Sequence, residues 1–190
     1  MEKELQSVQV VGLGQASVDY VGRVPVYPVE DSKMELERLF TSCGGPAATA
    51  LVTLARLGVP TSFLGSISDD PFGIQIADSL EKERVNISFL KITPGHSSQF
   101  AFIAVTMGEG KRTIFWNRSS APELTSKEVS LDRFSGARIL HLDGLMMDAD
   151  GRRNTEKRYP GPAFTGGYPD CIRATRGCSG WRRGATSEGT

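Results

Sequence analysis

Long apolar runs recur along residues 7–148 and predict the central strands of a folded domain. The runs at 8–14, 61–67 and 137–144 are rich in Val, Leu, Ile and Phe, and each contains glycine. A shorter segment at 87–93 has the same character. Strands that are buried on both faces show such runs, because helices cover both sides of a parallel sheet. We therefore expect a parallel sheet built on these segments.

Two amphipathic helices are predicted between these strands. The first begins at Pro46, and its apolar positions at helical spacing are Ala47, Ala48, Leu51, Leu54 and Ala55. Gly58 and Pro60 supply its end. Asp70 and Pro71 supply the N-cap and first turn of the second helix, whose apolar face consists of Phe72, Ile76 and Leu80. The alternation of strand and helix predicts an α/β fold with a doubly wound, Rossmann-like parallel sheet.

Other segments alternate apolar with polar residues, which suits strands that have one exposed face. They are residues 18–27, 33–42, 99–106 and 111–117. A glycine-bearing turn joins the last two. Because these segments interrupt the strand–helix alternation, we expect a small second β-sheet inserted into the main fold, over about residues 20–42 and 97–118.

Residues 150–190 differ in composition from the rest of the chain. They contain no Leu, Val or Met, whereas Gly, Lys and Arg are frequent. A segment so poor in aliphatic side chains cannot bury enough apolar surface to fold. We expect residues 1–149 to carry the folded part and residues 150–190 to form an irregular tail, either disordered or translated out of frame. A genuine Arg-Gly tail that binds RNA is the alternative.

Charge and cysteine content restrict the class of partner. The chain of 190 residues carries 22 basic and 22 acidic residues, so its zero net charge favours neither nucleic acid nor a membrane surface. No apolar run is long enough to cross a bilayer, and the charged N-terminus does not resemble a secretory signal. Three cysteines, an odd number, argue against a disulfide framework. We therefore expect a cytoplasmic protein with reduced cysteines.

The stretch CGGPAATALVTLARLG, residues 43–58, holds the first candidate for a binding site. Gly44 and Gly45 stand directly before the proline that starts a helix, and glycine lets a backbone take positive φ or approach another group closely. Asp19 lies just beyond the first strand, and its carboxylate can accept two hydrogen bonds from neighbouring hydroxyl groups. Together they predict a site for a polyhydroxylated ligand. A tight turn without a ligand and a solvated aspartate are the alternatives.

Three segments together resemble the ribokinase-like (PfkB) carbohydrate kinase family. GGPAATALVTLARLG is similar to the first signature of that family, FLGSISDDPFG to its strand–turn–helix segment, and VGLGQASVDYV to its first strand. The resemblance covers about residues 8–147, the N-terminal half of a usual member, and is nearest to the sulfofructose kinase-like subgroup. Two positions depart from the family pattern, since Thr49 replaces the usual Asn and Ser68 the usual Gly.

The resemblance implies transfer of a phosphoryl group from ATP, with Mg²⁺, to a hydroxyl group of a sugar. It implies that Asp19 anchors the sugar. Gly44 and Gly45 would bring backbone N–H groups to it. Thr49 would keep one of the hydrogen bonds that the usual Asn provides, unless it is an ordinary threonine on the helix surface.

The inserted sheet resembles the lid of this family, which closes over the sugar, excludes water and suggests a homodimer formed through the lid. Lys33 and Asn117 are expected on lid strands, where Lys33 would contact an anionic substituent of the sugar. Solvated edge-strand residues are the alternative for both. Asp143 ends a buried strand at the carboxyl edge, where open α/β sheets bind ligands. It is therefore either a substrate ligand or a helix N-cap.

The second signature of the family, a Gly-Ala-Gly-Asp segment with the anion hole and the catalytic base, has no good counterpart. In FTGGYPDC, residues 164–171, the aspartate lies one residue too far from the glycines, and a proline precedes it. We therefore expect no catalytic base, nucleotide site or metal site, and hence an inactive, truncated kinase.

Two alternatives from other classes remain open. The first is a non-catalytic module that binds sugar or dimerises through the lid. The second is an NAD(P)-dependent oxidoreductase, suggested by GLGQAS at residues 12–17, which is similar to a dinucleotide-binding fingerprint.

Overall fold

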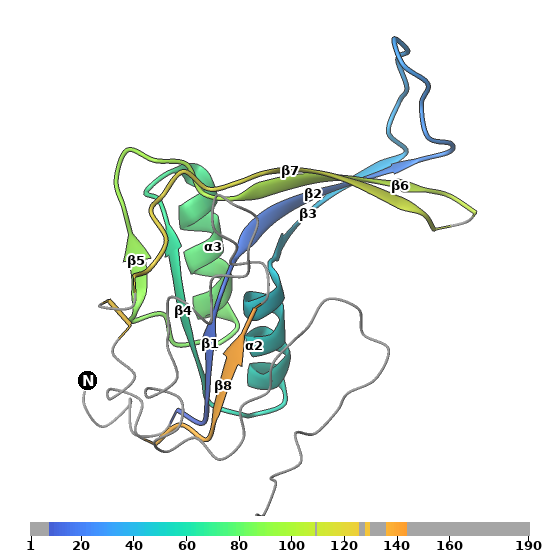
Figure 1. The fold of residues 1–190 in the computed structure, drawn as a ribbon. Coiled ribbons are helices and arrows are strands. Elements are labelled where there is room, and N and C mark those ends of the chain that lie inside the picture. Colours follow the sequence, from blue (N-terminus) through green and yellow to red (C-terminus); the bar gives the residue numbers. More distant parts are fainter. Residues whose placement is uncertain (1–7, 109, 126–127, 130–135, 144–190) are drawn as a thin grey trace, which may run out of the picture.

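A four-stranded parallel sheet forms the base of the molecule (Figure 1). The computed structural model describes residues 8–108, 110–125, 128–129 and 136–143. Within them the strand order of the base is β5-β4-β1-β8, and every neighbouring pair is parallel. Its strands are β1 (Val10–Leu13), β4 (Thr61–Ile67), β5 (Leu90–Ile92) and β8 (Ile139–Leu142). This confirms the parallel sheet that the apolar runs predict.

Helices α2 (Pro46–Arg56) and α3 (Pro71–Lys82) pack on one face of the base sheet. Their apolar faces meet the sheet in a core that includes Leu51, Phe63 and Ile76, all of them fully buried. The opposite face is covered by the later part of the described chain, through Leu124, Val129 and Ala137. The base is therefore buried on both faces, which explains why its strands appear in the sequence as continuous apolar runs.

The predicted C-terminal end of α2 and the predicted start of α3 are correct. Gly58, which follows α2, has a backbone φ of 81°, a conformation that glycine adopts without strain. Asp70 caps α3, because its carboxylate accepts a 2.8 Å hydrogen bond from the backbone N–H of Gly73.

A second four-stranded sheet, which we call the lid sheet, extends away from the base and the helices (Figure 1). Its order is β3-β2-β6-β7, in which β2 pairs antiparallel with β3 and parallel with β6, and β6 pairs antiparallel with β7. Its strands are β2 (Ser17–Val24), β3 (Arg38–Gly44), β6 (Phe100–Thr106) and β7 (Arg112–Asn117). The predicted second sheet is thus present and mixed.

The strand predicted at residues 33–42 is partly wrong. β2 stops at Val24 and β3 starts only at Arg38, so Lys33 lies in the connection between them and not on a strand. Pro25 and Pro28 explain the interruption, because a proline cannot donate a hydrogen bond to a neighbouring strand.

A hydrogen-bonded junction ties the lid sheet to the base. The backbone N–H of Ser68, which follows β4, donates to Ser98 Oγ at 2.8 Å. The backbone N–H of Ser98, two residues before β6, donates to the Asp70 carboxylate at 2.9 Å. Both serines are 1% exposed, so these bonds are shielded from water. Asp70 therefore holds both the start of α3 and the segment that leads into the lid.

The junction gives a testable prediction for Asp70→Ala. Burial raises the pKa of the Asp70 carboxyl, but hydrogen bonds from Ser98 and the N–H of Gly73 outweigh it, so the pKa lies below its ordinary value. A carboxyl whose pKa is lower in the folded state stabilises the fold at neutral pH, and this stability is lost as the pH falls. We expect Asp70→Ala to lower the free energy of unfolding by about 1–2 kcal/mol at neutral pH.

Urea denaturation at several pH values measures this effect. The difference between wild type and Asp70→Ala should shrink below about pH 4, where the carboxyl of the unfolded wild-type chain becomes protonated. Asp78, exposed on the same helix, offers the matched control Asp78→Ala, for which we expect little change. A destabilisation of Asp70→Ala that stays constant down to about pH 2 would contradict the assigned role of the carboxylate.

Candidate functional site

Asp19 and Gly44 lie side by side on one face of the lid sheet. The antiparallel pairing of β2 and β3 sets Ser17 opposite Gly44 and Asp19 opposite Ser42. Ser17 Oγ donates a 2.8 Å hydrogen bond to Asp19 Oδ1, which orients the half-buried carboxylate. A Cβ atom on residue 44 would collide with Asp19 Oδ2. Glycine at this position therefore makes room for the carboxylate.

Gly45 is required for a different reason. Gly45 is the N-cap of α2. Its backbone φ is 98°, in the region that residues with a side chain rarely adopt. A Cβ there would collide with the carbonyl oxygen of Gln15 and lie 2.7 Å from Ala16 Cα. The glycine pair thus packs the start of α2 against the loop between β1 and β2, and it brings backbone close to Asp19.

A row of positions crosses the lid sheet at its end nearest the base. From the pairing of the strands, the residues in this row are, in order, Gly44, Ser17, Gln99 and Arg118. Gln99 directly precedes β6, and Arg118 directly follows β7. The backbone N–H of Val18 donates to the carbonyl oxygen of Gln99 at 3.1 Å, so the row continues past the end of β6. Neighbouring strands are about 4.8 Å apart, so the row is roughly 14 Å long.

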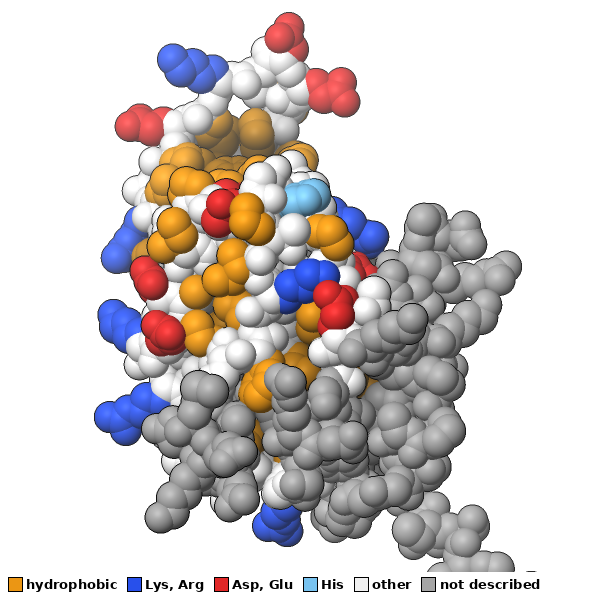
Figure 2. Space-filling view, turned by 90° about the vertical axis from the view of Figure 1, so that its left-hand side faces the viewer, with side chains coloured by type: hydrophobic (Ala, Val, Ile, Leu, Met, Phe, Trp, Pro, Cys, Tyr) orange, Lys and Arg blue, Asp and Glu red, His pale blue; other side chains and the backbone are white. Residues whose placement is uncertain are grey.

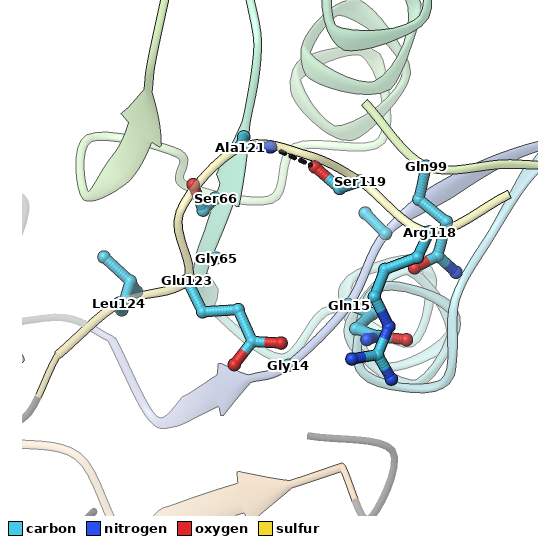
Figure 3. Close-up of a pocket in the computed structure, with 11 residues that line it drawn as sticks. Gly14, Gln15, Gly65, Ser66, Gln99, Arg118, Ser119, Ala121, Glu123 and Leu124 are labelled. Atoms are coloured by element: carbon cyan, nitrogen blue, oxygen red, sulfur yellow. Dashed lines mark hydrogen bonds between the residues drawn. The ribbon is translucent and has the colours of Figure 1, made fainter. Parts of the chain in front are cut away.

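A pocket opens at the Arg118 end of this row (Figure 3). Its empty space, including the solvent-filled mouth, is about 490 Å³. The polar side chains on its walls are those of Gln15, Ser66, Gln99, Arg118, Ser119 and Glu123. Figure 3 shows the Arg118 guanidinium and the Gln15 side chain close together on one side and the Glu123 carboxylate on the other. The pocket thus combines donors on one wall with an acceptor on the facing wall.

Asp143 supports the floor of this pocket. It follows β8, is 1% exposed, and accepts a 2.8 Å hydrogen bond from the backbone N–H of Gln15. Its own N–H donates to the carbonyl oxygen of Leu13 at 3.1 Å, and a Cβ on Gly14 would collide with its carboxylate. Asp143 therefore fixes the loop between β1 and β2. The helix that it was alternatively expected to cap lies outside the described residues.

Two titratable groups next to the site have shifted pKa values. Burial raises the pKa of the Cys43 thiol, a hydrogen bond with Ser79 partly offsets this, and the Asp19 carboxylate adds to the rise. Burial lowers the pKa of His141 on β8, against the opposing effect of Asp143. Both side chains are therefore neutral at physiological pH, so they contribute no charge beside the site.

The remaining residues predicted from the sequence are scattered. Thr49 lies exposed on α2, and its carbonyl oxygen accepts a hydrogen bond from Thr53 Oγ1. Asn117 lies exposed at the end of β7, beside Arg118. Lys33 is exposed in the connection at the far end of β2 and β3, so seven strand positions, or roughly 23 Å, separate it from the row at Gly44. The structure thus does not bring Lys33 to the other candidates.

Four of the polar residues in the pocket were not predicted from the sequence: Gln15, Gln99, Arg118 and Glu123. The available signal was position, because Gln99 is the first residue of one predicted strand and Arg118 directly follows another. It becomes informative only when the pairing of those strands is known.

The oxidoreductase alternative is not supported. A dinucleotide fingerprint requires a helix directly after its strand, because the helix N-terminus binds the pyrophosphate. After β1 the chain instead enters another strand, β2. GLGQAS is therefore a strand-to-strand connection.

Neither a metal cluster nor a membrane span is found in the described part of the chain. No three His, Cys, Asp or Glu side chains gather there in a way that could hold a metal ion. No helix in these residues is both long and apolar enough to cross a bilayer.

Comparison with known proteins shows similarity to sugar kinases. The chain is 28% identical over 118 residues to a fructokinase of Salmonella typhimurium, covering 62% of this chain and 38% of that protein. It is 34% identical over 103 residues to a 5-dehydro-2-deoxygluconokinase of Mesomycoplasma hyopneumoniae, covering 53% of this chain and 30% of that protein.

The fold agrees with solved ribokinases. The structure of Arabidopsis thaliana ribokinase complexed with ribose and ATP superposes with a TM-score of 0.60 at 22% identity, covering 72% of this chain and 45% of the other. The chain thus spans less than half the length of each of these relatives. The model of the pfkB family carbohydrate kinases matches residues 8–158, and the chain belongs to this family.

Proposed function

We propose that this chain forms the sugar-binding part of an ATP-dependent sugar kinase, with the lid sheet covering the sugar. The contact between the Asp19 carboxylate and Gly44 carries the proposal, because it sets an oriented acceptor beside a backbone that has no side chain. The family match and the fructokinase likeness support a sugar as ligand. The free Cys43 is consistent with the reducing environment of the cytoplasm.

Each proposed residue has a role in placing the sugar. Asp19 accepts hydrogen bonds from two neighbouring hydroxyl groups, while Gly44 and Gly45 let the sugar approach the backbone. Asp143 acts through the Gln15 backbone that it holds, as a positioning residue. Thr49 and Asn117 lie exposed at the edges, where they can contact a larger sugar. Together these groups orient the hydroxyl that receives the phosphoryl group.

ATP and Mg²⁺ belong to this proposal by family membership. The described residues contain no group of three His, Cys, Asp or Glu side chains that could hold a metal ion. No step through ATP or Mg²⁺ is therefore assigned to them. What these residues do supply is binding and orientation of the acceptor sugar, together with exclusion of water under the lid.

Calorimetric titration of the chain with D-fructose, D-ribose and NAD⁺ tests the proposed function. We expect at least one sugar to bind with heat that depends on Asp19, and NAD⁺ to give none. A coupled assay for ADP formation with the same sugars measures phosphoryl transfer. Absence of binding by any sugar at millimolar concentration, or binding of NAD⁺ alone, would overturn the proposal.

The lid is also the surface that we propose for a homodimer. Apolar side chains are exposed on its strands, and they are Leu39, Phe40, Ile114, Phe115 and Trp116. Figure 2 shows hydrophobic side chains gathered below the charged tip of the molecule on one face. Such exposure is unusual for a strand surface that stays in water and supports burial against a second copy.

Light scattering on the purified chain tests this association. Ile114→Glu should shift the population to monomers, because a buried charge at the lid interface is costly. Ile92→Glu is the matched control, since Ile92 is similarly exposed but lies on β5 of the base. Equal behaviour of the two variants would argue against a lid-mediated dimer.

A further inference from the structure

The side chain of Gln99 is free in a segment whose other polar side chains are hydrogen-bonded. Ser97 Oγ donates to Ser120 Oγ at 3.1 Å, and Ser98 Oγ accepts the backbone N–H of Ser68 at 2.8 Å. Gln99 itself is half-buried and lines the pocket (Figure 3). Within the described residues no group forms a hydrogen bond with its amide. A polar side chain that is half-buried in this way is available to a ligand.

The backbone of Gln99 is fixed on both sides. Its carbonyl oxygen accepts a 3.1 Å hydrogen bond from the backbone N–H of Val18 on β2. The N–H of the preceding residue, Ser98, donates to the Asp70 carboxylate at 2.9 Å. The amide is therefore presented from backbone that is already ordered, which lowers the entropic cost of binding.

Gln99 lies between two side chains of opposite hydrogen-bonding character. The row across the lid sheet sets Ser17 on one side of Gln99 and Arg118 on the other. Asp19 shares the face of Ser17 and is the diagonal neighbour of Gln99, at a separation of about 8 Å that long side chains bridge. A carboxylate only accepts hydrogen bonds and a guanidinium only donates them. The amide of Gln99 is therefore best satisfied with its carbonyl oxygen toward Arg118 and its NH₂ group toward Asp19.

The lid sheet leaves room for a ligand beside these two groups. Ala101 pairs with Asp19 across β2 and β6 and is 6% exposed, and its methyl group is the smallest side chain that a strand residue other than glycine can carry. A hydroxyl group above it meets an acceptor in Asp19 and a donor in Gln99. Because a hydroxyl group donates one hydrogen bond and accepts others, it satisfies both at once.

We propose that Gln99 determines the specificity of this site, by donating a hydrogen bond to the same hydroxyl group whose proton is accepted by Asp19. The inference rests on the proposed function and deepens it. The substrate must carry a free hydroxyl group at this position, since an ether oxygen has no proton for Asp19 and a deoxygenated carbon serves neither residue.

Calorimetry of the full chain with D-fructose and D-ribose tests the proposal. We expect Gln99→Glu to bind the sugar about tenfold more weakly than wild type, because two carboxylates then face a hydroxyl group that has one proton. Gln99→Met keeps the length of the side chain without its amide, and a similar loss is expected.

Exchanging the donor and the acceptor gives the sharpest test. The double variant Asp19→Asn/Gln99→Glu should bind about tenfold more tightly than Asp19→Asn alone. The hydrogen bond from Ser17 Oγ holds the amide oxygen at position 19 and turns the NH₂ group toward the sugar, while the carboxylate at position 99 accepts the proton. A residue with a merely structural role would not give this rescue.

Gln75→Glu is the matched control, because Gln75 is also half-buried but lies on α3 outside the pocket. Its affinity should equal that of wild type, and circular dichroism should show all variants folded. A double variant that binds no more tightly than Asp19→Asn would overturn the role of Gln99. Unchanged affinity in both single variants of Gln99, with binding that depends on Asp19, would also overturn it and leave the proposed function standing. If neither sugar binds to the wild type, this inference and the proposed function both fail.

Discussion

Replacement of Gly73 by alanine is expected to destabilise the fold by about 3 kcal/mol. Gly73 lies in the first turn of α3, where the helix backbone packs directly on the end of β4. A Cβ atom there would collide with the carbonyl oxygen of Ser68 and lie 2.7 Å from Ser98 Oγ. Backbone cannot move aside as a flexible side chain can, so the whole junction between base and lid must shift.

Urea denaturation followed by circular dichroism measures this loss, and Asp78→Ala on the same helix is the control. Alanine is intrinsically a better helix former than glycine by about 1 kcal/mol, so helix propensity alone predicts that Gly73→Ala stabilises the chain. The two effects have opposite signs. A midpoint that rises in Gly73→Ala would show that the packing of α3 on Ser68 is looser than the structure has it.

Local sequence signals were sufficient for the base sheet and its helices. The segment TSFLGSI forms β4 over all of its predicted residues, from Thr61 to Ile67. The helix predicted to begin at Pro46 begins there, and Asp70 caps the next one. Each of these features depends on neighbours within a few residues, such as a cap, a proline or a run of apolar side chains. Such signals are visible in one sequence.

The boundaries of the lid strands were harder to predict. Alternation of apolar and polar residues continues through the connection between β2 and β3, although this part of the chain pairs with nothing in the described sheet. Exposed strands and exposed loops share this alternation, because neither is buried on both sides. Lys33 was therefore placed on a strand that begins only at Arg38.

The candidate site was predictable on one side only. Asp19 and Gly44 were singled out by motif and residue type, and the structure brings them together. Gln99 and Arg118 were missed, because their place beside Ser17 depends on the parallel pairing of β2 with β6. These strands are separated by both helices, two base strands and the lid strand β3, and pairing over such a distance leaves no local pattern in the sequence.

Replacing the Asp19 carboxylate by an amide is expected to weaken sugar binding about a hundredfold, the equivalent of two charged hydrogen bonds reduced to neutral ones. Asp19→Asn keeps the size of the side chain, so the hydrogen bond from Ser17 Oγ and the fit beside Gly44 can persist. The fold should therefore be unaffected, and calorimetry with the sugar that binds best would show the loss in affinity alone.

A second variant, on the neighbouring strand β3, displaces the Asp19 carboxylate without changing it. Gly44→Ala introduces a Cβ that collides with Asp19 Oδ2, so the carboxylate must leave its place although its chemistry is unchanged. If sugar binding depends on the position of the Asp19 carboxylate as well as on its charge, Gly44→Ala should lose affinity for the sugar as Asp19→Asn does. The double variant should then lose little more affinity than either single variant. Ser42→Ala is the control, since Ser42 faces Asp19 across the same pair of strands. If the two losses in affinity add fully, the Gly44 backbone contacts the sugar independently of Asp19. If the double variant loses little more than either single variant, Gly44 acts by keeping the Asp19 carboxylate in place.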